Sequence, residues 1–200
     1  MKRINPGIHE MSRKAFLATA ALGATGLLLP HAALAQEAQT VTAPVGIILP
    51  SNIDPNSAEA AQYLWSKAVK QAELEGGKIG LNLEGNKPFT ALRTYVTGVT
   101  PQKGYWIKGL YTLVQAVASY NAYANGNIDQ CYGANIQVST GATVQWCTYN
   151  YAFIDSGQTL AVNFSCTIYL PANALSAACE FYAEFWADGS GHIGGGGPIA

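Results

Sequence analysis

Charged residues are scarce in this chain of 200 residues, since lysine and arginine number 11, aspartate and glutamate 12, and together they make up 12% of it. No lysine or arginine follows Lys108, whereas acidic residues continue into that half at Asp129, Asp155, Glu180, Glu184 and Asp188. Phosphate binding needs a basic face, so the sequence argues against a nucleic-acid partner. The same bias argues against binding to an anionic membrane surface.

Histidine is also scarce, and its positions limit the catalytic chemistry that the chain can support. His9 and His31 lie in an N-terminal stretch that we predict to be removed, which leaves His192 in a glycine-rich C-terminal segment. A Ser-His-Asp triad needs an imidazole held rigidly between two partners, and a zinc site of paired histidines needs two. We therefore predict that His192 is a solvated tail residue and that the protein uses no metal and no cofactor.

The N-terminal apolar run is too short for a comfortable membrane span. It covers residues 15–29, follows Arg13 and Lys14, and is succeeded by small residues at Ala33 and Ala35, which is the pattern of a secretory signal peptide. We predict that residues 1–35 are cleaved near Ala35, that the protein is secreted or periplasmic, and that it has no stable membrane insertion. An uncleaved anchor is the alternative.

Four cysteines remain in the mature chain, and an even count in an oxidising compartment indicates disulfides. Directly opposed residues of an antiparallel pair lie about 4.5 to 5.5 Å apart at Cα, which a disulfide can span. We favour Cys147 with Cys166 and Cys131 with Cys179, over Cys131 with Cys147 and Cys166 with Cys179. The chain has no close Cys-x-x-Cys pair, which disfavours a metal site.

Residues 141–188 read as three antiparallel strands and organise the rest of the prediction. Between residues 160 and 170 apolar and polar side chains alternate strictly, which predicts one buried and one wet face. A turn at residues 155–158 pairs Ile154 with Thr159 and so sets Cys147 opposite Cys166. A second turn pairs Leu170 with Leu175 and sets Cys179 beside Cys166. Both turns predict the same apolar face, and a slip of one residue would expose it.

The third of these segments has a competing interpretation. Residues 175–186 also fit the helical period, with Asn173 as a cap, but aromatic content and the matched register favour a strand. The clearest helix begins after a cap at Asn56 and ends at Gly76. We predict strands at residues 45–49, 78–83, 89–99 and 136–139, and leave residues 105–123 open between a helix and two strands.

These elements predict the fold class and the domain organisation. We expect a mainly β, α+β fold: an antiparallel β-sandwich-like domain with an N-terminal amphipathic helix packed on the sheet. A single disulfide-bonded domain would cover residues 36–188, and residues 189–200 would form a flexible glycine-rich tail.

The outward face of the three strands predicts the function. Aromatic rings stack on sugar rings, and amides and hydroxyls bond sugar hydroxyls without a charge penalty. We therefore expect a secreted, non-catalytic domain that recognises an extracellular glycan or cell-surface ligand. The predicted contact residues are Trp146, Asn150, Asn163, Tyr169, Tyr182 and Trp186.

Two other functions remain open. Low charge and strands rich in tyrosine and asparagine leave sheet edges unprotected, which is typical of a self-assembling cell-surface subunit and would make the protein a homo-oligomer. A glycoside hydrolase using Glu180 or Glu184 is the second alternative. Their Cα atoms would lie about 13 Å apart along a strand, which is wide for a carboxylate pair.

Overall fold

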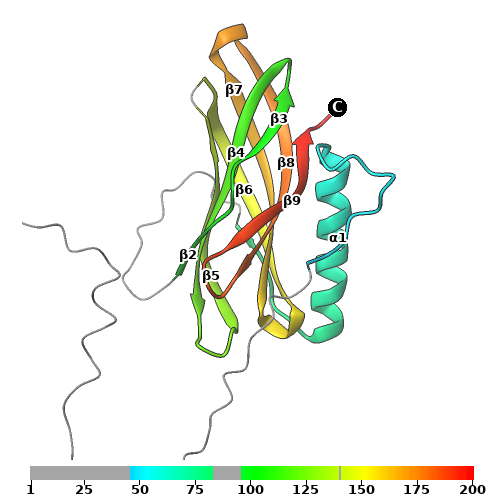
Figure 1. Cartoon of the computed structure of the whole chain (residues 1–200), viewed down its shortest axis with the longest axis vertical. Helices are drawn as coiled ribbons and strands as arrows, with labels where there is room; N and C mark the ends of the chain where they lie inside the picture. Colours follow the sequence, from blue (N-terminus) through cyan, green and yellow to red (C-terminus); the bar gives the residue numbers. More distant parts are fainter. Residues whose placement is uncertain (1–45, 83–95, 140) are drawn as a thin grey trace, which may run out of the picture. The chain divides into compact units, whose positions relative to one another are not determined.

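Two antiparallel sheets and one helix account for the regular structure of residues 46–82, 96–139 and 141–200, which are the residues that the computed structural model describes (Figure 1). The predicted signal peptide at residues 1–35 and most of the predicted strand at residues 89–99 lie outside them. The predicted class is confirmed, because the fold is mainly β with a helix packed on an antiparallel sheet.

Helix α1 spans Ala58–Glu75. The predicted cap at Asn56 would have started the helix one residue earlier. Ser57 is its N-cap, and the Ser57 hydroxyl accepts a hydrogen bond from the Ala60 amide at 3.2 Å. Gly76 ends the helix in the left-handed conformation, at φ 67°, as a C-terminal glycine commonly does. The buried stripe is almost entirely alanine and contains Ala58, Ala60, Ala61, Leu64, Ala68 and Ala72.

The larger sheet, sheet A, has five strands in the order β1-β6-β7-β8-β9. Its strands are β1 (Ile79–Asn82), β6 (Thr143–Ile154), β7 (Thr159–Leu170), β8 (Leu175–Trp186) and β9 (Gly191–Pro198). The predicted register is confirmed at both turns, since Cys147 lies opposite Cys166, Cys166 opposite Cys179, and Leu170 opposite Leu175. Residues 175–186 are therefore a strand and not a helix.

The glycine-rich C-terminal segment is not a flexible tail, which corrects that prediction. Residues 191–198 form β9, which pairs with β8 from Gly191 opposite Phe185 to Pro198 opposite Cys179. Glycine is needed there for close packing, because a Cβ on Gly195 would lie 2.8 Å from the Cβ of Ala60. Composition alone cannot separate glycine used for flexibility from glycine used for close approach.

The smaller sheet, sheet B, is built around one long strand. Its strands are β2 (Val96–Val99), β3 (Lys103–Ile107), β4 (Leu110–Ala122) and β5 (Ile128–Val138). Strand β5 pairs along one edge of β4, while β3 and then β2 pair along the other. Residues 105–123 thus form two strands, joined by a tight turn in which Lys108 and Gly109 both have positive φ. The predicted strand at residues 136–139 is the end of β5.

Sheet A is covered on both faces. Its inner face packs on sheet B in an aromatic core, where Tyr105 of β3 meets Phe181 of β8 edge to face with ring centroids 5.2 Å apart. Its other face carries α1, which contacts β9 and β8 most extensively and runs beside them in Figure 1. Sheet A is therefore the middle layer between a helix and a second sheet.

All four cysteines are free thiols in the structure, so the predicted disulfides are not formed there. Cys147, Cys166 and Cys179 lie in one row across β6, β7 and β8. Cys131 lies on β5 of sheet B, opposite Tyr120 of β4. This arrangement does not bring Cys131 to Cys179, because β5 packs mainly against β6 and β7 of sheet A and Cys179 lies on β8.

No helix of the described part is long and apolar enough to cross a membrane.

Candidate functional site

The six predicted contact residues all lie on the helix-facing side of sheet A. In the observed register Trp146 lies opposite Thr167, and Asn163 lies between Asn150 on one side and Tyr182 on the other. These are the neighbours that the sequence predicts. The helix, however, lies on the same side and divides the six residues into an open group and a covered group.

The open end of this face lies beyond the first turn of α1. Gly197 pairs with Glu180 of β8, and a Cβ on Gly197 would lie 2.3 Å from the carbonyl oxygen of Asn56, so the helix begins at the level of Glu180. Beyond that level Trp146 is 49% exposed and Tyr169 is half-buried. We call the surface around these two residues the open end.

Polar groups surround the two aromatic rings of the open end. The register shift between Val144 and Trp146 makes Gln145 the extra residue of a β-bulge. The Ser176 hydroxyl donates to Oε1 of Gln145 at 3.1 Å, which links β8 to β6 across β7. Such a surface offers an indole face, hydroxyls and an amide.

The covered part of the face corrects the expectation that all six residues face solvent. Tyr182 has no exposed surface and Asn163 is 6% exposed, because the alanine stripe of α1 lies directly over them. Asn150 is half-buried opposite Leu81 of β1. The sequence signalled a solvated face here because these side chains are polar or amphipathic.

Trp186 lies at the far end of the covered part. It is half-buried and its ring stacks on His192 of β9, with centroids 5.5 Å apart and planes 20° apart. Trp186 lies opposite Thr159, eight residues along β7 from the partner of Trp146. The two tryptophans are thus about 26 Å apart along the strand direction, too far for one small ligand to contact both.

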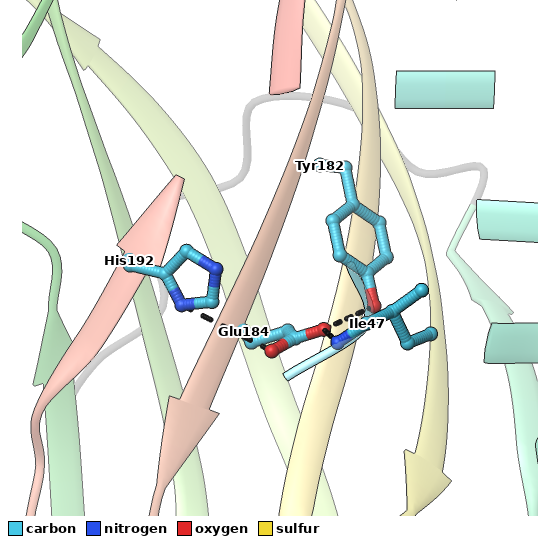
Figure 2. Close-up of polar contacts among 4 residues, drawn as sticks. All are labelled: Ile47, Tyr182, Glu184 and His192. Carbon is cyan, nitrogen blue, oxygen red and sulfur yellow. Dashed lines mark hydrogen bonds and ion pairs between the residues drawn. The ribbon is translucent and has the colours of Figure 1, made fainter. Parts of the chain in front are cut away.

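A fully buried carboxylate lies between Tyr182 and His192 (Figure 2). Oε1 of Glu184 accepts hydrogen bonds from the Tyr182 hydroxyl at 2.8 Å and from the Ile47 amide at 3.2 Å. Nδ1 of His192 lies 3.9 Å from Oε2. Burial, followed by the charge of Glu184, raises the pKa of Tyr182 well above its ordinary value, so the phenol remains a donor.

The extended segment of residues 46–49, here called the strap, closes this site from outside. A Cβ on Gly46 would lie 2.3 Å from Oε2 of Glu184, so the strap backbone lies directly on the carboxylate. Glu184 has no exposed surface, and a polymeric substrate cannot reach it in this form. Glu180 is half-buried on the same strand. The structure therefore does not present the two carboxylates in an open cleft, which a glycoside hydrolase needs.

The sequence analysis missed the position of His192, and it predicted a strand at residues 45–49, whereas residues 46–49 belong to neither sheet. A usable signal for the first was present: Asp188 and Gly189 form a turn dipeptide directly after β8, and the Trp186 amide donates to the Ser190 carbonyl across that turn. A hairpin prediction there would have placed His192 opposite Glu184. The strap contact depends on one backbone amide, for which the sequence holds no signal.

Two other features lack the chemistry of the open end. A cavity of about 340 Å³ lies at the end of α1, lined by Glu75, Lys78, Ile128, Asp129, Phe153 and Ser156 among others, and none of the six predicted contact residues lines it. Within the described ranges no group of three or more His, Cys, Asp or Glu side chains could hold a metal ion.

Comparison of the chain with protein-family models, with curated proteins and with solved structures found no match.

Proposed function

We propose that this protein is a secreted, non-catalytic binding domain that recognises a neutral extracellular glycan through Trp146 and Tyr169 at the open end of sheet A. One observation carries the proposal: Trp146, which is 49% exposed, lies on strand β6, where it pairs with Thr167 of β7. A strand holds its side chains more rigidly than a loop does, so the indole is preorganised for stacking.

The surroundings of Trp146 support a sugar as the ligand. Hydroxyls of Thr167 and Ser176 and the amide of Gln145 can bond sugar hydroxyls, while the indole packs on the apolar face of a sugar ring. No lysine or arginine lies beyond Lys108 in the sequence, so the strands that form the open end supply no cation for an acidic ligand.

Tryptophan fluorescence tests the proposal during titration with hydroxyethylcellulose, xylan, laminarin, mannan and dextran. We expect one of these polysaccharides to change the emission, and Trp146→Ala to abolish binding. Trp106→Ala is the matched control, because Trp106 is 68% exposed but lies on β3 of sheet B, edge to face with Tyr111. Equal binding by Trp146→Ala and wild type, or no response to any polysaccharide, rejects the proposal.

Secretion is a separate part of the proposal and needs its own measurement. Expression of the full chain followed by mass spectrometry should find a mature N-terminus at Gln36. Retention of residues 1–35 would contradict it.

A self-assembling subunit is the second candidate, favoured by one observation. Strand β1 forms an edge of sheet A, and its Ile79 and Leu81 are 45% and 60% exposed. Exposed apolar residues on an edge strand favour pairing with another chain. Sedimentation of the mature chain distinguishes the candidates, since a monomer at high concentration removes this one.

A further inference from the structure

We propose that α1 and the strap form a displaceable cover over the second half of the ligand face, and that an extended neutral polysaccharide occupies the whole face, from Trp146 to Trp186, once the cover has moved. This inference rests on the proposed function, because it extends the surface that begins at the open end. It identifies the ligand as a polymer and assigns α1 an autoinhibitory role.

The two faces of the same strands have opposite chemistry. On the inner face, Phe164, Phe181 and Phe185 are fully buried against sheet B. On the helix-facing side the corresponding positions hold Asn163, Tyr182 and Glu184. A permanently buried layer is normally apolar, as the inner face is. The covered face instead combines apolar residues, Ala152, Ile154 and Ala161, with amide and aromatic groups like those of the open end.

The cover leaves several polar atoms of this face without hydrogen-bond partners among the described residues. Four such buried atoms are Thr159 Oγ1, Asn163 Oδ1, Glu180 Oε2 and Trp186 Nε1, while Glu184 Oε2 and His192 Nδ1 face each other at 3.9 Å without a hydrogen bond. An unsatisfied buried polar atom destabilises the closed arrangement. Movement of the cover would allow these atoms to bond sugar hydroxyls, which are both donors and acceptors.

The cover is held by an apolar cluster that consists mainly of alanine. Among the buried residues of α1 only Leu64 is larger than alanine, and the half-buried Tyr63 and Trp65 pack against the same cluster. The strap belongs to neither sheet; its Ile47 amide donates to Glu184 (Figure 2), and the Ile47 and Leu49 side chains pack against the cluster. Segments with few apolar contacts are the ones that open locally in folded proteins.

The dimensions of the face indicate a polymer as its ligand. Trp146 and Trp186 mark its two ends, about 26 Å apart along the strand direction. A disaccharide at the open end would contact Trp146 without disturbing α1. A longer chain that continues along β7 must displace the helix, because α1 begins at the level of Glu180.

Hydrogen exchange of the full mature chain tests the cover directly. With a saturating polysaccharide from the panel above, we expect the amides of α1 to exchange faster than in the free protein while the amides of β7 and β8 stay protected. The disaccharide of the same linkage should leave α1 unchanged. Unchanged exchange of α1 with the polymer overturns the inference.

A pair of proline variants provides the second test. Ile47→Pro removes the amide that donates to Glu184, and Ile48→Pro is the matched control because the Ile48 side chain is 77% exposed. A larger open population raises apparent affinity, so Ile47→Pro should bind the polymer roughly threefold or more tightly, with disaccharide binding unchanged. Equal polymer affinity of both variants and wild type overturns the inference.

The two proposals fail separately. Suppose that Trp146→Ala loses binding, but the polymer does not change the amide exchange of α1 and Ile47→Pro binds the polymer as wild type does. The glycan site at Trp146 is then supported, and the displaceable cover is rejected. If Trp146→Ala binds as wild type does, the proposed function itself is rejected, and the cover with it.

Discussion

The phenolic oxygen of Tyr182 lies 2.8 Å from Oε1 of Glu184, and neither side chain has any exposed surface. The two residues are two positions apart on β8, so the period of the strand alone places them on the same face. The Ile47 amide bonds to the same oxygen. This buried carboxylate thereby joins β8 of sheet A to the segment that precedes the helix.

The first prediction concerns this hydrogen bond. Tyr182→Phe removes one donor from a buried carboxylate and changes little else in volume, so the free energy of unfolding should fall by about 1–3 kcal/mol. Urea denaturation followed by circular dichroism measures it. Tyr169→Phe is the control, because Tyr169 is half-buried at the open end of the same face. The free energy of unfolding of this variant should lie within about 0.5 kcal/mol of the wild-type value. Equal stability of the two variants would contradict the role of the bond.

Local sequence patterns were sufficient to predict the register of β6, β7 and β8. Two turns, at residues 155–158 and 171–174, set the pairing independently, and both place Phe164 and Cys166 on one apolar face. Agreement between two local constraints selects one register, because any slip would turn the apolar face toward water. The same patterns did not decide whether residues 105–123 form a helix or two strands. They also did not show that part of the outward face is covered.

The cover over that face could not be predicted, for a physical reason. Asn163, Tyr182 and Glu184 read as solvent-facing because their side chains are polar, yet all three are buried, Tyr182 under α1 and Glu184 under the strap. What brings the helix there is non-local: an alanine stripe that needs a partner with little side-chain volume, and a strand whose Gly194 and Gly195 provide it. Neither feature identifies its partner in the sequence.

Gly195 provides the second prediction. A Cβ there would lie 2.8 Å from the Cβ of Ala60 and 3.2 Å from its backbone carbon, and backbone cannot give way as a flexible side chain can. Gly195→Ala should therefore push α1 away from β9, lower the melting temperature and speed amide exchange in the helix. Gly194→Ala is the control, since its new methyl would meet the movable end of Leu64 at 3.1 Å. The prediction fails if both variants exchange alike.

Alkaline stability is the third prediction, and its sign follows from burial. Burial raises the pKa of Tyr105 and of Tyr120, with the charge of Asp188 adding to the second, and burial followed by Glu184 raises that of Tyr182. In the unfolded chain these phenols lose their protons near pH 10, so above that pH the unfolded state binds fewer protons than the native state. The stabilisation is complete below about pH 10 and is lost as pH rises further.

Urea midpoints measured between about pH 9 and pH 11 check this prediction, alongside the ultraviolet spectrum of phenolate. We expect the midpoint to fall over that range and three of the 11 tyrosines to ionise only on unfolding. Simultaneous ionisation of all tyrosines in the folded protein would contradict the burial of these rings.

The fourth prediction separates the thiol arrangement of the structure from the two-disulfide pattern expected from the sequence. Cys166 lies between Cys147 and Cys179 and can bond to one neighbour at a time, while Cys131 lies on β5 of sheet B. Oxidation of the folded chain should therefore form one disulfide and leave two free thiols.

If Cys147 is the partner of Cys166, the thiols that remain are Cys131 and Cys179. Burial raises the pKa of both to about 12, so both stay protonated at mildly alkaline pH, and the thiolate is the reactive form. Iodoacetamide should label them slowly in the folded protein and rapidly after unfolding. Thiol titration counts the free thiols, and peptide mapping without reductant identifies the disulfide. Two disulfides, with Cys131 bonded to Cys179, would show that β5 and β8 approach each other in a way that this sheet order does not allow.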